Sequence, residues 1–247
     1  ADYLLVVVFL IASTISFSLI TLPFSKVWAS VKNAAQADFE PVDNPNTPVG
    51  IAKGIFPGRV VWCYNPNATS WTGLNAKGKV DVVSGATELV PDGEWYLEGN
   101  IIQSQVDIML SETINNLTGK SSDAMAWNEI FRYFNRTHDK GDRGYQPGEK
   151  IAVKINLNNS NNHGAMNSCS NISPQMVLGL LRQLVDKAGV PAGNITFYDV
   201  SRMIPSTIYD LCKSAYPDVR FVDLHGGDGR IKSEPDPEYP VNWSQEL

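Results

Sequence analysis

The sequence of 247 residues contains only three cysteines, Cys63, Cys169 and Cys212, and they are far apart. No two of them form a CxxC pair, which argues against an iron–sulfur cluster or a zinc ribbon within this chain. An odd number also leaves at least one thiol without an intrachain disulfide partner. We expect three unpaired, mostly buried thiols, and we expect neither a metal site nor a cofactor.

The sequence also lacks the motifs of common nucleotide and acyl-transfer sites. It contains no Walker A sequence and no GxSxG, and the run from Gly226 to Gly229 is not GxGxxG. Basic residues form no stripe and the net charge is −6, so we expect no nucleic acid partner. With no complete catalytic set, the sequence names no reaction and leaves open whether the protein is an enzyme.

What the sequence does contain is typical of a folded domain. Hydrophobic residues make up 43% and charged residues 19% of the chain, which is the balance of a globular protein. The length corresponds to one large domain, or to a domain with an extension.

A long uncharged run opens the sequence, from Tyr3 to Leu22. As a helix with a rise of about 1.5 Å per residue it would span about 30 Å, the hydrocarbon thickness of a bilayer. Pro23 ends the run, and Lys26 and Trp28 suit the membrane interface. We therefore predict a single-pass transmembrane anchor in residues 1–25 that is retained in the mature protein.

A cleaved signal peptide is the alternative for this run. Residues 35–37, Ala-Gln-Ala, resemble a cleavage site, but they lie beyond the usual distance from the apolar run. Lys26 and Lys32 would place the following residues in the cytoplasm under the positive-inside rule. Because the sequence begins without Met or a basic leader, we expect its extreme N-terminus to be missing.

Residues 26–53 are predicted to be a juxtamembrane linker, because Pro41, Pro45 and Pro48 disfavour both helix and strand. Residues 54–247 form the predicted globular domain. Its first elements are a short apolar strand at 59–64 and two amphipathic helices at 100–117 and 123–135. Residues 138–144 are predicted to form a charged surface turn. The alternative is that His138, Asp139 and Asp142 bind a cation.

Residues 148–162 carry the clearest secondary-structure pattern. Apolar residues alternate with others from Ile151 to Leu157, which predicts a strand. Ser173 and Pro174 begin a helix, and we predict a second strand at 195–198, a helix at 205–215 and a third strand at 219–222. This order predicts an α/β fold, a Rossmann-like parallel sheet with flanking helices, preceded by the transmembrane helix.

Polar side chains follow each of the three predicted strands. The candidate ligand-binding residues are Lys154, Asn156, Asn158, Asp199, Ser201, Arg202, Asp223 and His225, with His163 nearby in the asparagine-rich loop. Strand carboxyl ends converge at one edge of a parallel sheet, so we expect one shared pocket. Arg202 and the helix amides after Ser173 favour an anion such as phosphate or carboxylate. Asp199 opposes this unless it pairs with Lys154 or Arg202, in which case the group is a structural ion pair.

Several of these stretches carry a family resemblance. They are GEKIAVKINLN at 148–158, residues 173–191, NITFYDVSR at 194–202, GIFPGRVVW at 54–62 and MAWNEIFRYFN at 125–135. On these residues the chain resembles the bacterial domain-of-unknown-function 362 family. The resemblance implies an extracytoplasmic domain that continues beyond residue 247, and it assigns no activity. Some members carry ferredoxin-type cysteine clusters, which this sequence lacks.

Two functions follow from these observations. The first is an accessory or structural subunit of a larger membrane protein complex, because the chain combines an anchor with a three-stranded sheet whose open edge needs a cover. Other subunits of such a complex, at a bacterial cell membrane with the domain on the extracytoplasmic side, are then the expected partners. The alternative is an enzyme or a small-anion-binding protein with its site at the strand carboxyl ends.

Overall fold

The computed structural model describes residues 3–6, 50–71, 79–80, 87–88, 97–166 and 170–238. The chain divides into two compact units, one made of Ala1–Val8 and Lys53–Leu247 and the other of Phe9–Ala52. Most of the second unit lies outside the described residues, and so does the predicted linker apart from residues 50–53.

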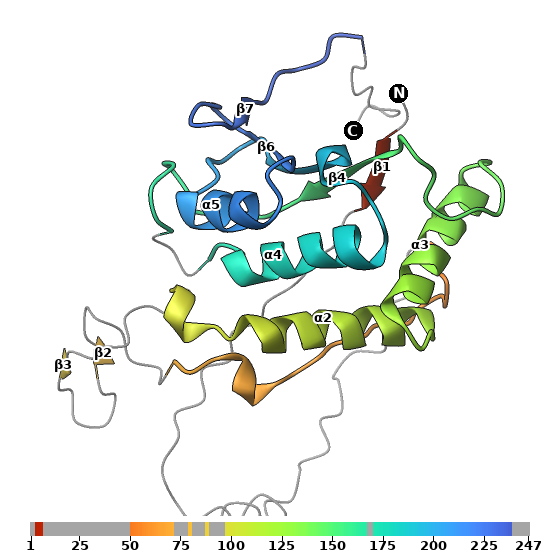
Figure 1. Cartoon of the computed structure of the whole chain (residues 1–247), viewed down its shortest axis with the longest axis horizontal. Helices are drawn as coiled ribbons and strands as arrows, with labels where there is room; N and C mark the ends of the chain where they lie inside the picture. The colour runs from red at the N-terminus through yellow and green to blue at the C-terminus, as the bar shows by residue number, and fades with distance from the viewer. Residues whose placement is uncertain are drawn as a thin grey trace, which may run out of the picture. The chain divides into compact units, whose positions relative to one another are not determined.

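A parallel five-stranded sheet lies at the centre of the first unit (Figure 1). Its strands, in spatial order, are β1 (Tyr3–Val6), β4 (Lys150–Lys154), β5 (Ile195–Asp199), β6 (Arg220–Asp223) and β7 (Ile231–Lys232). Every pair of neighbours is parallel. The parallel β4–β5–β6 order predicted from the sequence is therefore confirmed, whereas β1 and β7 were not predicted. A separate antiparallel pair joins β2 (Lys79–Val80) to β3 (Thr87–Glu88).

Four helices pack beside the sheet. They are α2 (Gln103–Thr118), α3 (Asp123–Thr137), α4 (Pro174–Arg182) and α5 (Ser206–Ala215), and α4 continues as a π-helical turn at Gln183–Lys187. All four were predicted, and their ends follow the expected signals. The Ser122 and Ser173 side chains accept hydrogen bonds from backbone amides as N-caps, and Gly119 ends α2 with a φ of 66°.

The helices cover one face of the sheet. In Figure 1, α4 and α5 lie against that face, and α2 lies on the far side of α4. Burial follows the same arrangement, because alternate strand residues such as Val153, Phe197 and Phe221 are almost fully buried, whereas Ala152, Thr196 and Val222 between them are half-buried. The core lies between sheet and helices, and no described helix covers the opposite face.

The predicted strand at residues 59–64 is absent, which corrects that prediction. These residues form an extended segment without a strand partner, and Val60, Trp62 and Tyr64 are exposed. The composition suits a strand, but strand formation needs a neighbouring edge, and this segment runs along α2 instead. Arg59 Nη1 donates to the carbonyl of Asn116 at 3.0 Å, and Asn65 Nδ2 donates to Gln105 Oε1 at 2.7 Å.

The predicted transmembrane segment lies mostly outside the described residues. Its first four described residues, Tyr3–Val6, form strand β1 in parallel register with β4, with Tyr3 beside Lys150 and Val6 beside Val153. Within the described parts of the chain, no helix combines the length and the apolar character that crossing a membrane requires.

Candidate functional site

The first feature of the strand carboxyl edge is the side chain of Asp199, buried at the end of β5. Its carboxylate accepts hydrogen bonds from the amide of Leu157 at 3.0 Å and from the amide and hydroxyl of Ser201 at 3.0 and 2.9 Å. The Nζ atom of Lys154 lies 3.0 Å away and also donates to the carbonyl of Ile155. The expected pairing of Asp199 is therefore with Lys154, and this ion pair ties the end of β4 to the end of β5.

Asp223 occupies the matching position on the next strand, directly beside Asp199 in the sheet register. Its fully buried carboxylate accepts from the amides of Ile204 at 3.0 Å, His225 at 3.1 Å and Gly226 at 2.7 Å. The imidazole Nε2 of His163 lies 2.8 Å from the same carboxylate. Each aspartate thus accepts hydrogen bonds from amides of the loop that follows its own strand. Each also contacts one basic side chain, Lys154 of β4 or His163 of the loop after β4.

The three loops that leave the sheet here are also bonded to one another. The amide of Met203 donates to the carbonyl of Ser160 at 3.3 Å, and the amide of Leu224 donates to the carbonyl of Arg202 at 3.1 Å. Arg202 in turn donates through Nε to the carbonyl of Asn158 at 3.0 Å. The carboxyl edge is consequently a hydrogen-bonded layer of loops.

The electrostatics of both aspartates favour the ionised form. Burial acts to raise the pKa of Asp199, but the amides of Ser201 and Leu157 and the Lys154 ammonium outweigh it, so the pKa lies below its ordinary value. Burial likewise opposes ionisation of Asp223, while the amides of Ile204 and Gly226 and the His163 ring lower its pKa overall. Two neighbouring carboxylates therefore stay charged because each has its own donors.

The other predicted site residues lie at the surface of this layer. Asn156, Asn158, Ser201 and His225 are exposed, and Arg202 is half-buried. Arg202 also donates to the carbonyl of Ser201 at 2.9 Å, so two of its donors are used by the backbone. The predicted site residues line none of four surface clefts found among the described residues. The structure brings the side chains of Lys154, Asp199 and Asp223 together at the base of this layer, and the others take part in it mainly through their backbone or at its surface.

Two basic residues have larger roles than the sequence indicated. The imidazole of His163, rather than that of His225, contacts Asp223, and its second nitrogen, Nδ1, lies 3.2 Å from the exposed carboxylate of Asp228. Arg230 is buried, donates to the carbonyls of Ile204 and Asp228, and lies over the Tyr209 ring at 4.1 Å. No sequence signal indicated that Arg230 would be buried, because strand β7, which directly follows it, was not predicted.

The chemistry open to His163 is limited by its neighbours. Carboxylates only accept hydrogen bonds, so the ring donates to both Asp223 and Asp228 only in its protonated form. In a catalytic triad the second ring nitrogen faces a nucleophilic hydroxyl or thiol. No such group bonds to the His163 ring within the described residues, where the ring lies between the carboxylates of Asp223 and Asp228 and connects their loops.

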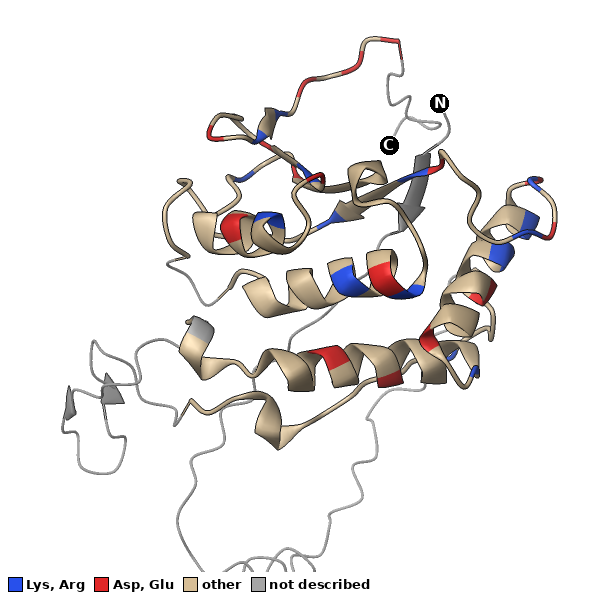
Figure 2. Cartoon of the chain, in the orientation of Figure 1, with Lys and Arg blue, Asp and Glu red and all other residues tan. Residues whose placement is uncertain are grey.

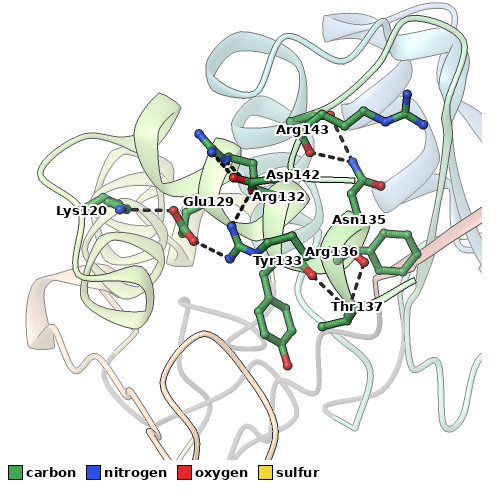
Figure 3. Close-up of polar contacts among 11 residues, drawn as sticks. Lys120, Glu129, Arg132, Tyr133, Asn135, Arg136, Thr137, Asp142 and Arg143 are labelled. Carbon is green, nitrogen blue, oxygen red and sulfur yellow. Dashed lines mark hydrogen bonds and ion pairs between the residues drawn. The ribbon is translucent and has the colours of Figure 1, made fainter. Parts of the chain in front are cut away.

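The charged turn after α3 is a surface ion-pair network, drawn in Figure 3. Asp142 accepts from both Arg132 and Arg136, and Glu129 connects Arg136, at 3.1 Å, to Lys120, at 3.3 Å. Hydrogen bonds from the two arginines hold the pKa of Asp142 well below its usual range. Because Asp142 is already paired with two arginines, it is not free to meet a cation.

Among the described residues, no group of three or more histidine, cysteine, aspartate or glutamate side chains is placed to hold a metal ion. Cys63 and Cys212 are free thiols, the first half-buried and the second buried. Burial raises the pKa of Cys212 to about 12, which makes it an inert core residue. Cys169 lies outside the described residues.

Comparison with known proteins found no match. No model of a known protein family, no curated protein and no solved structure matches this chain.

Proposed function

We propose that the chain is an accessory or structural subunit of a larger membrane protein complex. The observation that carries the proposal is the parallel sheet, which described helices cover on one face only. Parallel sheets occur almost exclusively with both faces covered. The open face combines Ala152, Thr196, Tyr198 and Val222, all half-buried, with the basic side chains of Lys150 and Arg220. A partner would therefore cover a surface that is partly apolar and partly basic.

The strand carboxyl edge supports this proposal over the alternative of an enzyme or anion-binding protein. The two carboxylates of the edge are bonded to backbone amides, and Lys154 and His163 are paired with them. An anion would have to compete with Asp199 and Asp223 for these two basic side chains, and Arg202 already donates to two carbonyls. Side chains whose donors and acceptors are already bonded to the loops stabilise the fold, and few of their hydrogen-bonding groups remain available to a ligand.

Membrane attachment is a separable part of the proposal and rests on the apolar run that begins at Tyr3. Strand β1 uses residues 3–6, and residues 7–22 as a helix would rise only about 24 Å. A span of about 30 Å therefore requires β1 to leave the sheet in the anchored state. Extracytoplasmic placement rests on the resemblance to the domain-of-unknown-function 362 family alone.

A photo-crosslinking experiment tests the subunit proposal. We replace Tyr198, on the open face of β5, with p-benzoylphenylalanine in the full chain and irradiate native membranes. The expected result is a covalent adduct with a different polypeptide. The matched control is the same replacement at Tyr216, which follows α5 on the helix side of the sheet and is expected to give far less adduct. Equal labelling from both positions, or none from Tyr198, would contradict the proposal.

A further inference from the structure

A surface cleft of about 360 Å³ lies between the first turn of α4 and one side of α5. Figure 1 shows these two helices side by side on the covered face of the sheet. Thr207, Asp210, Leu211 and Ser214 line the cleft from α5, and their spacing of three and four residues places them on one side of that helix. The volume lies in the range of small-molecule sites, roughly 300–1,000 Å³.

Gln175, in the first turn of α4, lines the same cleft and is only 3% exposed. Its backbone carbonyl accepts a hydrogen bond from Gln103 Nε2 at 3.0 Å. Its side-chain Oε1, in contrast, is buried and has no hydrogen-bond partner within the described chain. Buried polar atoms nearly always have a partner, because an unpaired acceptor has lost its water without any compensation. The cleft therefore contains an acceptor that a ligand with a hydrogen-bond donor would satisfy.

The charge of the cleft comes from the carboxylate of Asp210, at its exposed rim. Among the described residues that line it there is no lysine, arginine or histidine. Lys213, the other charged residue of α5, donates to the carbonyl of Pro217 at 2.7 Å and does not line the cleft. In Figure 2 the first half of α4 is tan, without charged residues, and α5 carries the acidic and the basic band. The lining is therefore acidic on balance.

The helix starts beside the cleft offer few free donors to an anion. The amide of Ser206, the first residue of α5, already donates to two loop carbonyls, both at 2.9 Å. Helix α4 begins with Pro174, which has no amide hydrogen. The amide of Met176 donates to the Ser173 hydroxyl at 3.2 Å. Because most of the amides that would bind an anion at a helix start are absent or bonded, the acceptors of the cleft decide which ligand it suits.

From these observations we propose that the cleft binds a small organic cation, a primary ammonium group on a short aliphatic chain. An ammonium group has three hydrogen-bond donors and no acceptor, so it suits Gln175 Oε1 together with the carboxylate of Asp210. Its positive charge balances that carboxylate in a charge-assisted hydrogen bond. The aliphatic chain then contacts the apolar part of the lining, to which Leu97, Met166 and Leu211 contribute.

Isothermal titration of the full chain with three compounds that share a butyl chain tests the choice of head group. Butylammonium is expected to bind with a Kd in the millimolar range, because so small a probe makes few contacts. Butan-1-ol, which lacks the charge, and pentanoate, which reverses it, should bind at least about tenfold more weakly. Equal binding of all three compounds, tighter binding of pentanoate, or no binding of butylammonium up to about 50 mM would overturn the proposal.

Substitutions then locate the bound cation. Gln175→Leu removes the Oε1 acceptor and Asp210→Asn removes the charge, and each should weaken butylammonium binding by about tenfold. Asp218→Asn changes an exposed carboxylate between α5 and β6 and is the matched control, which should bind as the parent does. Unchanged binding in both cleft variants, or an equal loss in Asp218→Asn, would place the cation elsewhere and overturn the proposal.

The melting temperatures of the free variants provide a second readout. Because Gln175 Oε1 is unpaired in the free chain, Gln175→Leu should leave the melting temperature unchanged or raise it. Asp210 is exposed, so Asp210→Asn should fold as the parent does and keeps the binding test valid whatever the outcome for Gln175→Leu. No result at this cleft affects the crosslink from Tyr198 on the open face of the sheet, so the subunit proposal is tested separately.

Discussion

At the scale of single residues, Asp199 and Asp223 hold the carboxyl edge of the sheet together. Each lies at the end of a buried strand, and each accepts hydrogen bonds from backbone amides that have no other described partner. Leaving a buried amide unpaired costs about 1–3 kcal/mol. The two carboxylates therefore have a structural role. Replacing either one would leave several backbone amides without a hydrogen-bond acceptor at the same time.

The pKa shift of Asp199 predicts how stability depends on pH. Its folded-state pKa is lowered relative to an unfolded value of about 3.9, so the unfolded chain binds more protons as the pH falls. The contribution of Asp199 is thus complete above about pH 5 and is lost on further acidification. Urea unfolding from pH 7 to pH 3 should show a smaller decline for Asp199→Asn than for the parent. Asp218→Asn, an exposed matched control, should keep the parental decline, and an equal decline in all three would refute the assignment.

The two histidines of the loop layer offer a second matched pair. His163 contacts the buried Asp223, whereas His225 is exposed and only its backbone amide takes part. His163→Ala leaves Asp223 without its basic partner and should lower the free energy of unfolding by about 1–3 kcal/mol. His225→Ala should change it by less than about 0.5 kcal/mol. Urea unfolding at pH 6 measures both, and a larger loss for His225→Ala would show that the loops are arranged differently.

At the scale of elements, the loop between β6 and β7 depends on one glycine. Gly226 has a φ of 66°, and a Cβ there would lie 2.6 Å from the backbone nitrogen of Lys232 in β7. Gly227 has a φ of 91°, but a Cβ there meets no atom within 4 Å. Both substitutions to alanine carry backbone strain, and only Gly226→Ala also forces β7 away from β6.

Thermal unfolding of the two alanine variants therefore separates the backbone strain, which both variants share, from the steric clash with Lys232, which only Gly226→Ala introduces. Gly226→Ala is expected to be less stable than Gly227→Ala by about 1–3 kcal/mol, the usual cost of overpacking. Equal stability of the two variants would mean that β7 does not pack against this loop.

The elements also show which parts of the fold sequence reasoning can reach. The helices α2 to α5 and the strands β4 to β6 were predicted because their apolar periodicity and caps are local signals. Strands β1 and β7 were missed because each is a short edge strand defined by its neighbour. Residues 59–64 have strand composition, yet hydrogen bonding along α2 decides their place.

The candidate site shows the same limit. Asp199, Asp223 and Lys154 were found because they stand at strand ends, where the sheet register fixes their position. His163 was placed near the cleft and His225 among the candidates, but the contact of His163 with Asp223 was not predicted, because the sequence does not reveal the path of a long loop. The loop after β4 brings His163 back to Asp223, which only the structure shows.

At the scale of the whole molecule, the described chain has one sheet face that no described helix covers. We propose that a different polypeptide covers it. The loop layer at the carboxyl edge then acts as the rigid connection that keeps the sheet in shape while its open face is covered.

The most direct test of the subunit proposal is the mass and composition of the native assembly. The full chain is extracted from native membranes under mild conditions and measured by native mass spectrometry. The 247 residues have a mass of 27.1 kDa. We predict a species larger than one copy of the chain that contains at least one other polypeptide. A stable, monodisperse species with the mass of one copy of the chain and no other polypeptide would contradict the proposal.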